Sequence, residues 1–161
     1  MNNSNVLVAR MGQMQVAQSG ETLKAIMGSC VGIGILWRKR GIFALSHCLL
    51  GNAPQDRTER SAKYVSDAIP MMLDALQVET RRDRRALEAV VVGGGTMLQA
   101  TGNPGGEEIG PSNLQAAERY LTENRVPIRH LQNAADNASQ LFIYGNTGEY
   151  EVVLIPKLVV E

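Results

Sequence analysis

The chain has 161 residues, 44% of them hydrophobic and 20% charged, and its 16 basic residues balance 16 acidic ones. This length predicts one domain over residues 1–161 with a real core, and the neutral balance argues against nucleic acid as the main ligand and against a basic membrane anchor. No apolar run approaches the roughly 20 residues of a membrane helix, the N-terminus lacks a secretory pattern, and two cysteines exclude a disulfide scaffold. We therefore expect a cytoplasmic protein with reduced thiols.

Strand patterns dominate the first fifty residues. Two short strands are expected at residues 5–10 and 14–18, and a third at 23–27. Residues 31–37 alternate aliphatic side chains with glycine, and a polar turn separates them from a second strand at 42–50. The two segments together predict a β-hairpin.

A helix is expected next, because apolar residues between Val65 and Leu76 recur at helical spacing. Pro70 lies inside this pattern and predicts a kink or a later start. The basic stretch from Arg81 to Arg85 is expected to be a solvated turn, with docking to an acidic partner as the functional alternative.

The second half of the chain continues with a buried strand at residues 87–92. A second helix follows, and Ser112 and Gln115 form a candidate capping box at its start. The chain closes with a hairpin, whose strands at 140–144 and 149–155 flank a Gly-Asn-Thr-Gly turn. Many strands and two main helices without regular alternation predict an α+β fold, with packed β-sheets covered on one side by the helices.

The turn formed by Gly28, Ser29 and Cys30 is the first candidate for a catalytic site. A glycine there lets backbone N–H groups face outward to hold an oxyanion, while a cysteine nucleophile needs a base that raises its thiolate fraction. Pairing around a turn near residue 39 sets Val31 opposite His47, so the hairpin brings Cys30 and His47 to one end. The structural alternative is a small buried cysteine and a hydrogen-bonded histidine.

The remaining cysteine and glycine motifs have simpler interpretations. Cys48 is expected in the core, because neighbours on a strand face opposite ways. No metal site is expected, because the Cys and His residues lack metal-ligand spacing, while a redox-sensing Cys30–Cys48 disulfide remains an alternative. Gly93, Gly94 and Gly95 lack the lysine and Ser/Thr of a phosphate loop, so a tight turn after a strand is expected.

Several motifs follow one another in the order of a known family. Residues 27–32 and 46–50 carry the Gly-Ser-Cys to His spacing, and residues 91–97 read Val-Val-Gly-Gly-Gly-Thr-Met. Ile-Gly followed by Asn113 and a Thr-Gly hairpin at 147–148 add support. The chain thus resembles the CheD family of chemoreceptor glutamine deamidases, which implies an α/β/β layered fold distantly similar to that of the cytotoxic necrotising factor toxins.

The resemblance implies hydrolysis of a glutamine side chain in a chemoreceptor, without a metal or organic cofactor. Cys30 would be the nucleophile and His47 the base. The turn at Gly28 and Ser29 would bind the oxyanion, and the glycines at 93–95 would lie beside the catalytic residues. A CheC-type phosphatase is implied as a second partner.

The sequence departs from the family pattern at two places. Lys24 stands where the family usually has a threonine, six residues before the cysteine, and Thr22 on the same strand face would substitute. Lys24 would favour the Cys30 thiolate, leave His47 without an orienting partner, or simply be solvated. Residues 133–140 lack the family's Asp-x-Gly-Gly and arginine, which predicts a changed partner surface. The alternative function is a non-catalytic adaptor that binds chemoreceptors or a CheC-type phosphatase.

Overall fold

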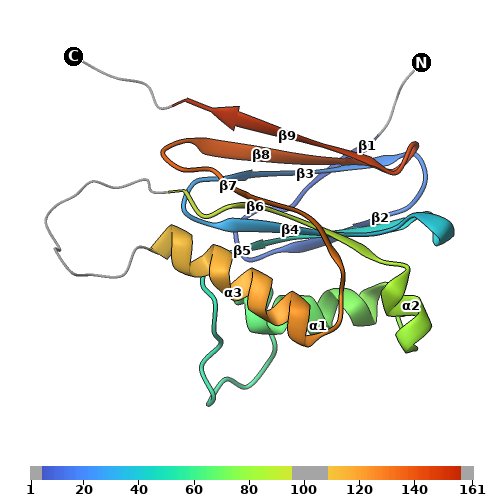
Figure 1. The fold of residues 1–161 in the computed structure, drawn as a ribbon, viewed down its shortest axis with the longest axis horizontal. Coiled ribbons are helices and arrows are strands. Elements are labelled where there is room, and N and C mark those ends of the chain that lie inside the picture. The colour runs from blue at the N-terminus through green and yellow to red at the C-terminus, as the bar shows by residue number, and fades with distance from the viewer. Residues whose placement is uncertain (1–4, 96–108, 157–161) are drawn as a thin grey trace, which may run out of the picture.

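The computed structural model describes residues 5–95 and 109–156. Two β-sheets stack on each other, and helices cover the outer face of one sheet (Figure 1). The four-stranded sheet has the order β1 (Asn5–Val8), β3 (Glu21–Met27), β8 (Ala138–Tyr144) and β9 (Glu149–Ile155). The five-stranded sheet has the order β2 (Met14–Ala17), β5 (Ile42–Cys48), β4 (Val31–Trp37), β6 (Glu88–Gly93) and β7 (Ile128–Asn133).

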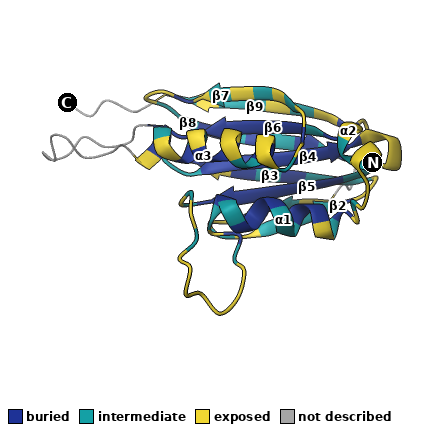
Figure 2. Cartoon of the chain, turned by 60° about the horizontal axis from the view of Figure 1, so that its bottom comes forward, coloured by how far each residue is buried: buried dark blue, intermediate teal, exposed yellow. Residues whose placement is uncertain are grey.

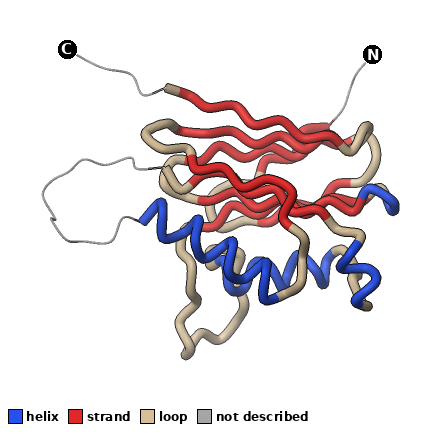
Figure 3. The backbone as a smooth tube through the Cα atoms, viewed as in Figure 1, coloured by secondary structure: helices blue, strands red, loops and turns tan. Residues whose placement is uncertain are grey.

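The helices lie on the five-stranded sheet. Two main helices, α1 (Val65–Ala75) and α3 (Ile109–Glu123), pack against each other and against β5 and β6 respectively (Figure 3). A short helix, α2 (Arg81–Arg85), precedes β6, and a 3-10 turn, η1 (Arg38–Arg40), joins β4 to β5. The predicted α+β class, with packed sheets and two main helices on one side, is confirmed.

Strand β4 is buried on both faces, because the second sheet covers one face and the helices cover the other (Figure 2). Val31, Ile33 and Ile35 point into the helix-side core, whose other buried members include Ala44, Cys48, Ile69, Met72, Val91 and Leu121. Gly32 and Gly34 face the inter-sheet core, which includes Leu23, Met27, Leu36, Phe43, Leu45, Val90, Val92, Leu141 and Ile143. A Cβ at position 34 would lie 2.6 Å from Ile143 Cδ1, so glycine lets the sheets pack closely.

The structure shows where the two predicted helices begin. The helix α3 begins at Ile109, so Ser112 lies in its first turn and does not cap it. Pro111 suits this earlier start, since a proline in the first turn gives up an N–H that needs no helical partner. The helix α1 begins at Val65, and Pro70 inside it does not delay its start.

The arginine-rich segment is a helix and not the expected turn. Thr80 and Asp83 form a capping box, in which Thr80 Oγ1 accepts from the Asp83 N–H at 3.0 Å and the Asp83 carboxylate accepts from the Thr80 N–H at 3.1 Å. These bonds satisfy donors at the helix start, which lets five residues form a helix despite four like charges.

One strand is not visible in the sequence pattern. In β7, partly buried and exposed residues alternate at a sheet edge. Its polar residues Arg129, His130 and Gln132 interrupt the apolar alternation by which a strand is predicted from sequence. It pairs in parallel with β6, and α3 makes the crossover between them. The fold therefore contains one β-α-β unit.

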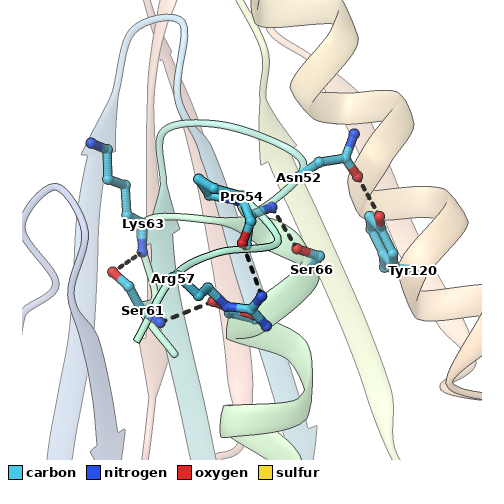
Figure 4. Close-up of polar contacts among 9 residues, drawn as sticks. Asn52, Pro54, Arg57, Ser61, Lys63, Ser66 and Tyr120 are labelled. Carbon is cyan, nitrogen blue, oxygen red and sulfur yellow. Dashed lines mark hydrogen bonds and ion pairs between the residues drawn. The ribbon is translucent and has the colours of Figure 1, made fainter. Parts of the chain in front are cut away.

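The connection from β5 to α1, residues 49–64, includes an exposed loop that side chains fasten to the helices (Figures 2 and 4). Arg57 Nη2 donates to Asp67 Oδ1 at 2.6 Å, and the Ser61 N–H donates to Asp67 Oδ2 at 3.1 Å. On the other side of the loop, Asn52 Oδ1 accepts from the Tyr120 hydroxyl. Asp67 is buried in the first turn of α1 and is thus the main anchor of the loop.

Replacing Asp67 by alanine is expected to lower the free energy of unfolding by about 1–3 kcal/mol, because Arg57 and the Ser61 amide lose a charged acceptor. Asp74 on the same helix is the matched control, because it pairs with Arg60 at 2.9 Å where both side chains are exposed. Asp74→Ala is expected to cost less than about 1 kcal/mol. Urea denaturation measures both losses, and equal losses would contradict the anchoring role of Asp67.

Candidate active site

Cys30 and His47 lie at the same end of the stacked sheets, where β4 begins and β5 ends. The predicted hairpin is present, but Val31 pairs with Cys48, and Gly32 pairs with His47. The predicted pairing of Val31 with His47 is therefore wrong by one residue. The cause is the turn, which contains four residues and ends at Gly41 in a left-handed conformation with φ 64°.

The observed register places Cys30 and His47 on the same face of the five-stranded sheet. His47 faces the inter-sheet core together with Phe43 and Leu45, whereas Cys48 is buried in the helix-side core, as predicted. Cys30 also packs against the inter-sheet core. It lies two residues before Gly32, the pairing partner of His47, just ahead of the first residue of β4.

A backbone carbonyl orients the His47 imidazole. Its Nδ1 lies 3.0 Å from the carbonyl oxygen of Ala9, which can only accept, so Nδ1 carries the proton and Nε2 carries a lone pair. Nε2 is buried and has no hydrogen-bond partner in the part of the chain that the structure describes. An imidazole in this tautomer can take a proton at Nε2. Ala9 gives no signal in the sequence, because any residue type supplies the same carbonyl.

The side chains of Thr22 and Lys24 do not join this pair. Alternate residues of β3, from Leu23 to Met27, are buried in the inter-sheet core, so Thr22 and Lys24 face the outer surface of the four-stranded sheet. There Lys24 Nζ lies 5.6 Å from the centre of the Phe142 ring.

The support that Thr22 or Lys24 was expected to give His47 comes from Ala9 instead. Position 24 contributes only through its backbone, because the Lys24 carbonyl accepts from the Ala9 N–H at 2.8 Å. A lysine in place of the family's threonine is compatible with that bond.

The three glycines after β6 lie against the turn that carries Cys30. The Gly94 N–H donates to the Cys30 carbonyl at 3.0 Å, and the Gly95 N–H donates to the Gly28 carbonyl at 3.2 Å. Gly93 has φ 127°, and a Cβ there would lie 2.4 Å from the Cys30 oxygen. The motif is thus a tight turn beside Cys30, as predicted, and glycine at position 93 is required for the close approach.

Two amide groups of the Cys30 turn are candidate hydrogen-bond donors to an oxyanion. The carbonyl of Gly28 is held by the glycine turn, so the Ser29 N–H of the same planar peptide unit points the opposite way. Across residues 5–95 and 109–156, no protein acceptor meets the N–H of Ser29 or Cys30. Two such donors beside a thiol suit a negatively charged oxygen.

Burial shifts both groups toward their neutral forms. Desolvation raises the pKa of the Cys30 thiol and lowers the pKa of His47, whose bond to the Ala9 carbonyl opposes the shift in part. The pair therefore rests at neutral pH as a thiol and a neutral imidazole.

Alkylation of Cys30 by iodoacetamide is accordingly expected to follow an apparent pKa above the ordinary thiol value of about 8.5. Peptide mass mapping across a pH series measures it. Cys48 is the internal control and is expected to stay unmodified in the folded protein, since it is fully buried and burial raises its pKa still further. An apparent pKa below 8.5 for Cys30 would mean a preformed thiolate–imidazolium pair instead.

The other predicted features are placed as follows. Cys30 and Cys48 are free thiols that pack into different cores, so the geometry gives the disulfide alternative no support. Within the described residues, no cluster of three His, Cys, Asp or Glu side chains could hold a metal ion, and no helix is long and apolar enough to cross a membrane. The altered segment 133–140 borders the site, because the Ala134 N–H donates to the Gly93 carbonyl at 3.0 Å.

Comparisons with known proteins show to which family the sequence is similar. A family model described as CheD chemotactic sensory transduction matches residues 49–153. A probable chemoreceptor glutamine deamidase CheD of Bdellovibrio bacteriovorus is 37% identical over 148 residues, which cover 92% of this chain and 94% of that protein. A probable chemoreceptor glutamine deamidase CheD of Methanococcus vannielii is 31% identical over 117 residues, or 72% of this chain and 73% of that protein. The chain belongs to the CheD family.

Proposed function

We propose that this protein is a chemoreceptor glutamine deamidase in which Cys30 is the nucleophile and His47 the base. The arrangement of His47 carries the proposal: the Ala9 carbonyl fixes Nδ1–H, which leaves a lone pair on Nε2 at the face that Cys30 shares. The substrate class follows from the relatives, which are named as chemoreceptor glutamine deamidases.

The first half of the reaction forms a thioester. Cys30 Sγ attacks the carboxamide carbon of the glutamine, and His47 Nε2 takes the thiol proton. The carbonyl oxygen becomes negatively charged and is held by the N–H groups of Ser29 and Cys30. His47 then gives its proton to the leaving nitrogen, ammonia departs, and the acyl group remains on Cys30.

The second half releases glutamate. His47 takes a proton from a water molecule that attacks the thioester carbon, the carbon–sulfur bond breaks, and the proton returns to the thiolate. The chain itself supplies nucleophile, base and oxyanion donors, so the reaction needs no metal or organic cofactor. The protein would work in the cytoplasm, with a CheC-type phosphatase as a second partner.

A non-catalytic adaptor is the competing function. Lys24 and the altered segment at 133–140 are the two departures that suggest an adaptor. The first carries less weight in the structure, since the Lys24 side chain faces the opposite surface while its carbonyl still supports Ala9. An adaptor also has no need of an imidazole whose lone pair is kept unpaired. The altered segment at 133–140 stays compatible with a changed partner surface in an active enzyme.

The proposal is tested by incubating the whole chain with a chemoreceptor fragment that carries glutamine side chains. Peptide mass spectrometry is expected to find glutamine converted to glutamate at defined positions, with release of one ammonia per conversion. Modification of Cys30 by iodoacetamide before mixing is expected to stop the conversion. Binding of the fragment without any conversion, in the presence or absence of a CheC-type phosphatase, would overturn the enzyme and favour the adaptor.

A further inference from the structure

A buried asparagine on α3 holds the two strand ends that carry the site. Asn113 Nδ2 donates to the Ser29 carbonyl at 3.2 Å and to the Leu49 carbonyl at 2.7 Å. The residue is only 2% exposed. The amide therefore donates both of its hydrogens to carbonyls outside the regular sheet, one just before Cys30 and one just after β5.

This bond completes a set of three. The carbonyls of Gly28, Ser29 and Cys30 accept from the Gly95 N–H, from Asn113 Nδ2 and from the Gly94 N–H respectively. Every carbonyl of the turn is therefore fixed toward the protein interior. Two of the donors are backbone groups, and only the middle carbonyl depends on a side chain.

The middle carbonyl decides where the amide of the nucleophile points. The Ser29 carbonyl and the Cys30 N–H belong to one planar trans peptide unit, so they point in opposite directions. Fixing the carbonyl toward α3 therefore aims the Cys30 N–H away from α3. A flip of this peptide would replace an oxyanion donor by a carbonyl oxygen, which repels negative charge.

We propose that Asn113 is a positioning residue that orients the Ser29–Cys30 peptide and so aims the Cys30 N–H at the oxyanion. The first turn of α3 is seated closely enough for this task, because a Cβ at Gly110 would lie 2.3 Å from the Gly95 oxygen and 2.4 Å from the Gly94 oxygen. The inference rests on the proposed function for its substrate, but the orientation of the peptide can be tested without a receptor.

The test compares two reactions of the same thiol. With 4-nitrophenyl acetate, Cys30 Sγ bonds to the acetyl carbon through an oxyanion, 4-nitrophenolate leaves, and the thiol proton passes to His47 and solvent. With iodoacetamide, Cys30 displaces iodide and no oxyanion forms. The measured quantity is the acetylation rate of Cys30 divided by its alkylation rate. This ratio, divided by the same ratio for N-acetylcysteine, reports how far the protein stabilises the oxyanion.

Asn113→Ala and Asn113→Asp are expected to lower this ratio by about 10- to 100-fold, since one oxyanion donor is misdirected. Alkylation is expected to change less than about threefold, which also shows that the variants are folded around Cys30. Asn124→Ala and Asn124→Asp are matched controls, because Asn124 Nδ2 donates to the Tyr120 carbonyl at 2.8 Å at the far end of α3. The controls are expected to keep the wild-type ratio.

Three results would overturn the inference: an unchanged ratio in the Asn113 variants, equal falls of both rates, or a wild-type ratio no higher than that of N-acetylcysteine. Equal falls would mean that Asn113 holds the thiol or the fold in general. A raised wild-type ratio that depends on Asn113, found in a protein that converts no receptor glutamine, would refute the deamidase proposal and leave the inference standing.

Discussion

Replacing Cys30 by alanine is expected to lower the rate of glutamine deamidation by more than about 10⁴-fold, to the background rate. The variant has no nucleophile, and no other thiol can act in its place, because Cys48 is fully buried in the helix-side core. Mass spectrometry of a receptor fragment measures the loss. The variant is expected to bind the fragment as the wild type does, because Cys30 is small and already partly buried.

Cys48→Ala is the matched control for this loss. It removes the second thiol from the helix-side core and is expected to keep the deamidation rate within about threefold, at a cost of roughly 1 kcal/mol in stability. A Cys30→Ala variant that still converts glutamine would refute the catalytic assignment. A variant that converts no glutamine but restores full chemotactic signalling would show that the protein acts as an adaptor.

The sequence predicts the candidate site well where a local pattern carries the information. Alternation along the 31–37 segment predicts a strand, and a polar turn followed by a second apolar segment predicts its partner. The two predicted strands place Cys30 and His47 at the same end of the hairpin, and an error of one residue in the strand register does not change this. The register itself depends on the conformation of four turn residues ending at Gly41, which a hydrophobic pattern does not encode.

The partner of His47 could not be predicted from residue types. The Ala9 carbonyl reaches the imidazole because β1 pairs in parallel with β3, a contact between segments that no turn connects directly. Thr22 and Lys24 are the candidates that the family resemblance implies. Their exclusion depends on which face of β3 meets the second sheet, and that is a tertiary fact.

The remaining errors have similar causes. The strand β7 lies at a sheet edge, where polar residues are tolerated and the apolar alternation fades. The helix α2 exists because Thr80 and Asp83 cap each other, which outweighs the repulsion of neighbouring arginines. Asn113 belongs to a motif of the family resemblance, but only the folded chain shows that it meets two carbonyls.

Replacing His47 by glutamine is expected to lower the deamidation rate about 10²- to 10⁴-fold. A glutamine amide can still donate to the Ala9 carbonyl, so the packing is retained, but it offers no basic lone pair to the thiol. The other histidine of the chain is the matched control. His130 lies on β7, where its ring contacts Tyr150 and Gln132, and His130→Gln is expected to keep the rate within about twofold.

The pH dependence separates a base from a merely structural histidine. Burial lowers the pKa of His47, so the neutral, active imidazole is expected to persist below the ordinary value of about 6.5, and the wild-type rate falls only at lower pH.

The same shift of the His47 pKa affects stability. Below about pH 6.5 the unfolded chain takes up a proton that folded His47 resists, so the free energy of unfolding falls as the pH drops. His47→Gln is expected to remove this contribution and the acid limb of the residual rate, whereas His130→Gln is expected to keep both. Profiles of rate and urea stability from pH 5 to about pH 8 measure the two effects. An acid limb that survives unchanged in His47→Gln would assign the base to another group.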